Sequence, residues 1–360
     1  MKFGHFTMPS HPPERSLRDG VEWDLQVIRW CDALGFTEAW VGEHHTAPWE
    51  PNPAPDLLLA QAIRETQRIR LGPGGFLLPY HHPAELANRV AMLDHLSGGR
   101  LNFGVAASGL PSDWHLFQVD GMSGVNRDMT REALDLILRL WREDEPFTHE
   151  GKFWKVAKPG EMFGLLRPHL KPLQQPHPPI AVAGLSKGSD TLKLAGERGF
   201  IPMSLNLNPG YVASHWDSVL AGAQRTGRTP HRGDWRLVRE VLVAPTDAEA
   251  ERLALSGPMA RMMREYFLPL LSNFGFQAYF KHDASVPDSD VTVEYCAKHN
   301  WIVGSPSTVA EKIEAMYHEV GGFGTLLVFG FDFAETPGVW QRSLQLLAEE
   351  VAPRLEHLKP

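Results

Sequence analysis

The chain has 360 residues, of which 43% are hydrophobic and 22% are charged, and it contains 11 Trp and 18 Phe. This apolar content is enough to form a large core, so the composition indicates a globular protein and excludes extended disorder. The formal net charge of -8 leaves no basic surface for binding nucleic acid. We therefore expect no nucleic-acid partner.

The sequence carries no feature that indicates export or insertion into a membrane. Its two cysteines, Cys31 and Cys296, are too few for a disulfide framework and indicate a reducing compartment. The opening MKFGHFTM lacks the basic segment and apolar run of a signal peptide. No apolar stretch approaches the ~20 residues that span a bilayer. We expect a cytoplasmic protein without a membrane segment.

Segments with strand-like and helix-like patterns alternate along most of the chain. The expected strands are residues 2–8, 38–41, 69–78, 101–106, 180–183, 201–205, 235–243 and 325–329. The expected helices are residues 20–34, 56–65, 83–97, 126–141, 187–198, 210–225, 247–256, 305–320 and 339–351. Parallel strands need helical crossovers and a sheet of this kind closes at eight strands, so the pattern predicts an α/β fold of the (β/α)₈ TIM-barrel class.

Two stretches interrupt the alternation. Residues 142–179, after the fourth helix, are rich in Pro, Gly and aromatic residues and are interpreted as an insertion that contains a hairpin. Residues 258–300, between the seventh and eighth strands, form a second irregular zone with many aromatic residues. Long loops in compact domains are often functional, so both are candidates for a substrate lid. No linker divides the chain, and we expect one barrel domain over residues 1–360.

The segment AWVGEHHTAPW, residues 39–49, places Glu43, His44 and His45 where the second strand ends. In a barrel the active site is built from the loops at the carboxyl ends of the strands. Adjacent histidines on a strand face opposite sides and match no closed zinc pattern, so we expect no metal site. A metal-dependent barrel hydrolase using these histidines stays open as an alternative.

Other strand ends carry small or aromatic residues. Gly74 and Gly75 interrupt the third strand, either as a bulge or to let a flat ring system lie against the backbone. Trp49, Phe76 and Trp114 near the strand ends would line an apolar substrate pocket, although aromatic residues are more often part of the core.

The segment after the fifth strand suits a phosphate. Ser186, Lys187, Gly188 and Ser189 open a helix, where backbone amides point outward with a positive dipole. Helix capping by a serine explains the same residues equally well. Arg127, at the start of the helix after the fourth strand, would add a charge-assisted contact to the phosphate or lie on the surface.

Several of these segments together resemble the bacterial luciferase-like family of flavin-dependent monooxygenases. They are, in order, MKFGHF at 1–6, GFTEAWVGEHH at 35–45, LGPGGFLLPYHHP at 71–83, LDHLSGGRLNFGV at 93–105, AGERG at 195–199 and VGSPSTVAEKI at 303–313. Within the family the chain is more similar to the limonene and diketocamphane monooxygenases, which oxygenate terpenes and alicyclic ketones, than to the light-emitting luciferases.

The resemblance implies a barrel that takes reduced FMN from a separate reductase, by diffusion, and uses dioxygen to form a 4a-hydroperoxyflavin. One oxygen atom then passes to an apolar small molecule such as a terpene, alicyclic ketone or aldehyde. His44 matches the catalytic histidine of the family, and Gly74, Gly75 and Ala106 match the residues that border the flavin ring. The resemblance also allows a non-prolyl cis peptide at the glycine pair and implies a homodimer.

One departure from the family pattern concerns the phosphate. Luciferases have a Cys-Arg pair after the fourth strand, and this chain has Ala106 and Ala107 instead. Arg127 matches the other phosphate-binding arginine of the family. Two further alternatives stay open, namely a deazaflavin-dependent oxidoreductase of the same fold and a non-catalytic flavin-binding protein.

Overall fold

The computed structural model describes all 360 residues and is built around one nine-stranded sheet with the order β3-β2-β1-β13-β10-β9-β8-β5-β4. Every pairing within it is parallel. The strands are β1 (Lys2–Thr7), β2 (Glu38–Val41), β3 (Arg70–Pro73), β4 (Phe76–Leu77), β5 (Phe103–Ala106), β8 (Ile180–Gly184), β9 (Ile201–Ser204), β10 (Arg236–Arg239) and β13 (Thr325–Phe329).

The sheet closes on itself because its two ends belong to one predicted strand. β3 and β4 are the two halves of the expected strand 69–78, broken at Gly74 and Gly75. β3 pairs with β2, β4 pairs with β5, and an isolated parallel bridge joins Leu71 to Leu101. With the two halves taken together the barrel has eight strands in parallel order, which confirms the predicted (β/α)₈ fold.

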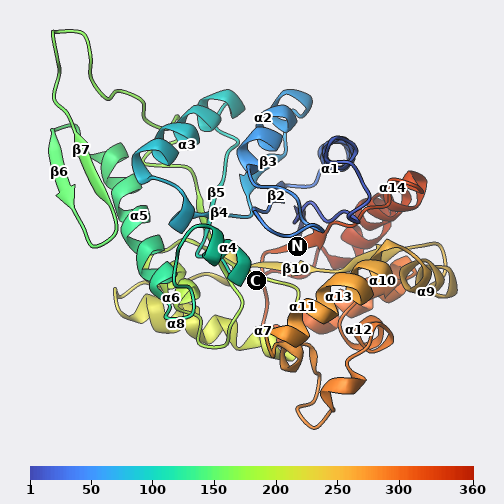
Figure 1. The fold of residues 1–360 in the computed structure, drawn as a ribbon. Helices are drawn as coiled ribbons and strands as arrows, with labels where there is room; N and C mark the ends of the chain where they lie inside the picture. The colour runs from blue at the N-terminus through green and yellow to red at the C-terminus, as the bar shows by residue number, and fades with distance from the viewer.

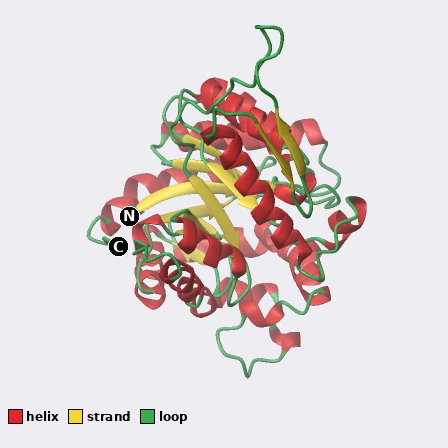
Figure 2. Cartoon of the chain, turned by 90° about the vertical axis from the view of Figure 1, so that its left-hand side faces the viewer, coloured by secondary structure: helices red, strands yellow, loops and turns green.

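Helices surround the strands as a ring, with the strands at the centre of the molecule (Figures 1 and 2). The helices of the ring are α1 (Leu17–Ala33), α2 (Pro55–Glu65), α3 (Pro83–Ser97), α5 (Val125–Arg142), α6 (Asp190–Arg198), α8 (His215–Gln224), α13 (Pro306–Val320) and α14 (Pro337–Leu346). Shorter helical segments are η1 (Leu78–Tyr80), α4 (Pro111–Leu116), α7 (Pro209–Ala213), η2 (Arg232–Asp234), α9 (Asp247–Ser256), η6 (Leu347–Val351) and η7 (Ala352–Leu355). No helix combines the length and the apolar character needed to cross a membrane.

The ends of the helices follow the expected local signals, as α13 illustrates. The Ser305 hydroxyl caps this helix by accepting a hydrogen bond from the backbone N–H of Thr308, and Pro306 occupies the first turn, where its missing N–H costs nothing. The helix ends at Gly321, whose φ of +79° is readily adopted only by glycine. The sequence therefore fixes both ends of the last crossover before β13.

The first insertion is the expected hairpin. Strands β6 (Phe147–Glu150) and β7 (Lys155–Lys158) pair antiparallel and lie outside the ring of helices (Figure 1). The hairpin predicted within residues 142–179 is thus confirmed.

The second insertion differs from the expectation of an irregular zone, because it is largely helical. It contains α10 (Pro258–Met262), the π-helical turn η3 (Met263–Phe267), α11 (Leu268–Asn273), the 3₁₀ turns η4 (Gln277–Phe280) and η5 (Asp288–Asp290), and α12 (Val293–His299). α10, η3 and α11 follow one another without a break over residues 258–273, but the π-helical turn in the middle departs from the 3.6-residue period, and the remaining pieces are too short to show one. The structure also divides the expected strand 235–243, since β11 (Val241–Val243) pairs with the unpredicted β12 (Ile302–Gly304) in a separate parallel pair.

The interior of the barrel is filled with side chains. One cluster of 83 buried hydrophobic residues extends along the chain from Phe3 to Leu358. At the amino end of the strands, Arg236 on β10 donates to Glu38 on β2 at 3.0 Å, and these strands are not neighbours, so the ion pair crosses the barrel. Because the interior is occupied, the loops at the carboxyl ends are where a site can form.

Candidate active site

The loop after β2 holds His44 between two buried carboxylates. The Nε2 atom of His44 lies 3.4 Å from Oε2 of Glu50, and its Nδ1 atom lies 3.7 Å from Oδ2 of Asp113. Glu50 belongs to the same loop, whereas Asp113 comes from α4. Burial by itself would lower the pKa of His44, but the charges of Glu50 and Asp113 outweigh it and raise the pKa above its usual value. The geometry therefore favours an imidazolium at position 44.

Glu43 ties the same loop to the neighbouring strand. Its carboxylate is fully buried and accepts hydrogen bonds from Nε2 of His45 at 2.8 Å, Nε2 of His81 at 2.9 Å and the backbone N–H of Leu77 at 3.1 Å. Burial would raise the pKa of Glu43, but the hydrogen bonds from the two histidines lower it below its usual value. Glu43 thus acts as an ionised anchor for the rings of His45 and His81, while the backbone N–H of His45 donates to Asp113 at 3.4 Å.

The glycine pair is required by close packing beneath it. An added Cβ on Gly75 would lie 2.6 Å from backbone atoms of Gly104 and Val105, and one on Gly74 would lie 2.8 Å from the ring of Phe6. The break between β3 and β4 is therefore a bulge that only glycine allows. The peptide bond between the two glycines is trans, since the structure has a single cis peptide at Gln175–Pro176, so the expectation of a cis bond here is wrong.

Two small residues of this region remain accessible at the carboxyl edge of the barrel. Gly74 and Ala106 are both half-buried, and Ala106 pairs with Leu77 at the end of β5. Packing alone explains the glycine at position 75. Gly74 and Ala106 are still accessible, so a flat group can rest on the edge that they form.

The expected phosphate residues lie at the start of α6. The Ser189 hydroxyl accepts from the backbone N–H of Leu192 at 3.3 Å, which confirms the capping alternative for this serine. Gly188 has a φ of +72°, and the backbone N–H of Lys187 donates to the Tyr211 hydroxyl at 2.7 Å.

A second cation lies at the same helix end. Nη1 of Arg127, from the start of α5, lies 3.6 Å from Oδ2 of Asp190, the first residue of α6. Ala106 ends β5, and Ser186 follows the end of β8. These two strands are neighbours in the barrel because β5 pairs with β8. The structure thus brings Arg127 to the loop 186–189, as the anion-binding hypothesis requires.

The three aromatic residues expected to line one pocket do not come together. Phe76 is fully buried, with its ring centroid 6.3 Å from that of Phe103, so it belongs to the core, in agreement with the alternative interpretation. Trp114 is half-buried and covers Gly121, where an added Cβ would meet its ring at 2.1 Å. Of the three, only Trp49 lines the large cavity of the structure.

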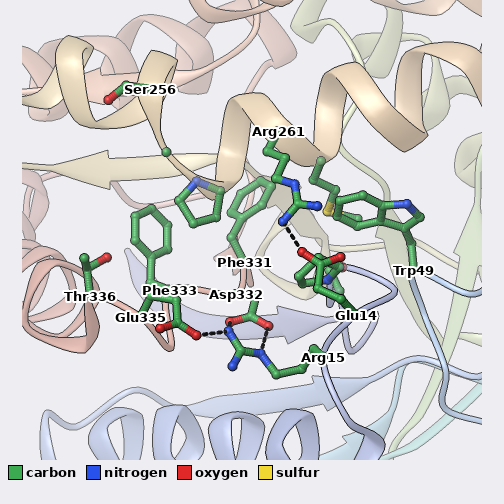
Figure 3. Close-up of a pocket in the computed structure, with 15 residues that line it drawn as sticks. Glu14, Arg15, Trp49, Ser256, Arg261, Phe331, Asp332, Phe333, Glu335 and Thr336 are labelled. Atoms are coloured by element: carbon green, nitrogen blue, oxygen red, sulfur yellow. Dashed lines mark hydrogen bonds and ion pairs between the residues drawn. The ribbon is translucent and has the colours of Figure 1, made fainter.

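That cavity has a volume of about 540 Å³ and lies between the loop after β1, the loop after β13 and the junction of α9 with α10. Figure 3 shows Arg261 reaching over Trp49 and pairing with Glu14, while Arg15 pairs with Asp332 on the opposite side. Its lining residues are Ser10, Pro12, Glu14, Arg15, Trp49, Ser256, Gly257, Pro258, Arg261, Met262, Phe331, Asp332, Phe333, Glu335 and Thr336.

Sequence reasoning missed three residues around His44. Glu50 is an acidic residue in a loop rich in proline, six positions after His44, and its proximity in the chain was the available signal. Asp113 and Tyr266 are distant in the chain, and nothing in the sequence placed them near His44. The structure contains no group of three or more His, Cys, Asp or Glu side chains placed to hold a metal ion, so it offers no support for the hydrolase alternative.

The chain is similar to known proteins over almost its whole length. A family model described as luciferase-like monooxygenase matches residues 1–323. The 3,6-diketocamphane 1,6-monooxygenase of Pseudomonas putida is 33% identical over 372 residues, covering 99% of this chain and 98% of that protein. The limonene 1,2-monooxygenase of Rhodococcus erythropolis is 32% identical over 365 residues, covering 98% of this chain and 86% of that protein.

A solved structure extends the likeness to three dimensions. The oxygenating constituent of 3,6-diketocamphane monooxygenase from the CAM plasmid of Pseudomonas putida, described as a type II Baeyer-Villiger monooxygenase in complex with FMN, matches with a TM-score of 0.92. It is 34% identical, and the match covers 98% of each chain. From the family match and these relatives together, the chain belongs to the luciferase-like monooxygenase family, as the sequence resemblance predicted.

Proposed function

We propose that this protein is the oxygenase component of a two-component monooxygenase that uses reduced FMN and dioxygen. It would transfer one oxygen atom to an apolar small molecule such as a terpene, an alicyclic ketone or an aldehyde. The observation that carries the proposal is His44, held between Glu50 and Asp113 at the carboxyl end of the barrel beside the edge formed by Gly74 and Ala106. Membership of a monooxygenase family supports it.

The residues present fit FMN. Gly74, Gly75 and Ala106 offer an edge without bulky side chains for the ring system, and a Cβ at either glycine would disturb that edge. At the start of α6, Arg127 lies 3.6 Å from Asp190 and so brings a guanidinium to a helix N-terminus, where we propose that the phosphate binds with Lys187 nearby in the chain. When bound there, reduced FMN would supply the electrons that activate dioxygen.

The protein's own contribution to the chemistry is a proton held at His44. The neighbouring carboxylates favour the protonated ring, because they stabilise its charged form and raise the pKa of His44 above its usual value. A protonated ring of this kind can donate to a reacting oxygen and recover the proton afterwards, which is general acid–base catalysis worth roughly 10²–10⁴ in rate. The cavity adjoins the site through Trp49, the neighbour of Glu50 in the loop after β2, and we propose that its apolar part, Trp49 with Met262, Phe331 and Phe333, takes the substrate.

The proposal also covers the domain organisation, the oligomeric state, the compartment and the partner of the protein. We infer a single barrel domain that forms a homodimer in the cytoplasm and receives reduced FMN by diffusion from a separate flavin reductase. The description of the diketocamphane relative as an oxygenating constituent supports the division into two components.

The experiment that tests the function is product analysis. The purified protein is incubated with dioxygen, FMN, a flavin reductase with NADH, and a panel of terpenes, alicyclic ketones and aldehydes. We expect a product heavier than its substrate by one oxygen atom, formed only when the reductase is present. Oxygen-independent turnover supported by a reduced deazaflavin, with no product from reduced FMN, would contradict the proposal.

A further inference from the structure

One hydrogen bond and one ion-pair contact join the second insertion to His44 through Glu50. Tyr266 lies in the π-helical turn η3, more than 200 positions after His44 in the sequence, and its hydroxyl donates to Oε2 of Glu50 at 2.8 Å. The same Oε2 atom faces Nε2 of His44 at 3.4 Å. Glu50 is therefore shared between the catalytic loop and the insertion.

The insertion also holds the loop next to Glu50. The ring of Trp49 stacks on that of Tyr266, with centroids 6.1 Å apart and planes 15° from parallel. The guanidinium of Arg261, from α10, lies 5.6 Å from the centre of the Trp49 ring and also pairs with Glu14 (Figure 3). Residues 49 and 50 are thus fixed by contacts from α10 and η3 rather than by the barrel alone.

We propose that Glu50 and Tyr266 are positioning residues for His44. Tyr266 orients the Glu50 carboxylate by a hydrogen bond, and Glu50 holds the His44 ring in its reactive orientation and charge. The role of His44 rests on the proposed function, whereas the effect of Glu50 and Tyr266 on the His44 ring does not. The consequence is that a loop after β2 and a distant insertion act on the same imidazole.

Burial lowers the pKa of His44, and the carboxylates that face the ring, first Glu50 and then Asp113, raise it. Its own loop contributes Glu50 and, farther away, Glu43, whose charge is shared with His45 and His81. The helix α4 contributes Asp113 at 3.7 Å, and η3 contributes Tyr266 through Glu50. Burial and the neighbouring Glu50 raise the pKa of Tyr266 well above its usual range, so this side chain stays a neutral donor. Burial raises the pKa of Glu50, whereas the charge of His44 and the hydrogen bond from Tyr266 act in the opposite direction and favour the ionised carboxylate.

Two conservative substitutions separate these contributions. Glu50→Gln removes the charge but keeps the shape, and Tyr266→Phe removes only the hydroxyl while keeping the ring that stacks on Trp49. Tyr295→Phe is a matched control, because Tyr295 belongs to the same insertion and its hydroxyl hydrogen-bonds to His282 instead. His44 is followed by NMR titration of histidine-labelled protein, with its signal assigned from a His44→Gln variant.

We expect Glu50→Gln to lower the pKa of His44, Tyr266→Phe to lower it less, and Tyr295→Phe to leave it unchanged. In turnover, we expect kcat of Glu50→Gln to fall roughly tenfold to 100-fold, less than a full loss of acid–base catalysis, and its pH profile to move in the same direction as the NMR titration. A Glu50→Asp variant should restore part of the rate because it restores the charge.

The outcomes distinguish the two proposals. If His44 titrates at the same pH in the parent and in both variants, the positioning proposal is wrong, whatever reaction the protein catalyses. If the titration shifts as expected in a protein without oxygenase activity, the positioning of His44 stands and the proposed function fails. Should Glu50→Gln not fold, Tyr266→Phe decides, since it alters no charge and no packing contact.

Discussion

The buried histidine in the loop after β1 predicts how the stability of the fold depends on pH. His11 is only 3% exposed, and its Nδ1 and Nε2 atoms lie 2.9 Å from Asp332 and 3.2 Å from Asp24. Burial by itself would lower the pKa of His11, but the two carboxylates raise it from 6.5 to about 9. The charged ring thereby joins the loop after β1 to the loop after β13 and to α1.

The magnitude follows from linkage between protonation and folding. A pKa of about 9 in the folded chain, against 6.5 in the unfolded one, corresponds to about 3 kcal/mol of stability, since one pH unit is worth about 1.4 kcal/mol. Because the folded value is the higher one, this contribution is complete below about pH 6.5 and is lost as the pH rises to 9 and above. The protein should therefore be less stable at pH 9.5 than at pH 6.

The assay is the free energy of unfolding from urea titrations at pH 6 and pH 9.5, for the parent and for His11→Asn. We expect the parent to lose about 3 kcal/mol between the two pH values, in keeping with the linkage relation, and the variant to be less stable at pH 6 but to lack most of this loss. An equal loss in both proteins would assign the pH dependence to other groups and refute the role given to His11.

Three further predictions concern the candidate site. Gly75→Ala should lower the unfolding free energy of the flavin-free protein by about 1–3 kcal/mol, because the added Cβ would meet the backbone of β5. Unchanged stability would show that the backbone here can shift to accept a Cβ. Phe76→Ala should lower the unfolding free energy by about 3–5 kcal/mol, as for a core aromatic residue, and leave KM little changed. A raised KM with unchanged stability would show that Phe76 lines the substrate pocket instead. Arg127→Ala should weaken the binding of FMN but not of riboflavin in fluorescence titrations, and equal weakening of both would exclude a phosphate contact.

The barrel was predictable because its signals are local. Alternating strands and helices, with caps such as Ser305 and Gly321, can be recognised along the sequence without knowledge of contacts. The break at Gly74 and Gly75 was visible as a pair of glycines, but its role in closing the sheet depends on the pairing of β3 and β4 with different neighbours. The helical residues 258–273 were missed because the π-helical turn η3 interrupts the 3.6-residue period, and the remaining helices of residues 258–300 are too short to show one.

The site was predictable only in part, for a related reason. His44 could be proposed because a contiguous motif carries the family resemblance, and Arg127 was proposed as the match to a phosphate-binding arginine of the family, outside those motifs. Asp113 and Tyr266 come from α4 and η3, and their distance to His44 or Glu50 is set by tertiary packing that no local pattern encodes. Phe76 was expected in the pocket but lies in the core, since a position at a strand end does not reveal to which side the ring points.

The central claim, that this chain transfers oxygen from dioxygen with His44 as its acid–base group, is tested most directly by isotope incorporation. The protein and its His44→Ala variant would be given reduced FMN and ¹⁸O₂ with a substrate identified from the panel, and the product analysed by mass spectrometry. The account predicts one ¹⁸O atom per product molecule from the parent and a rate lower by roughly 10²–10⁴ in the variant. Product without ¹⁸O, or an unchanged rate in the variant, would contradict it.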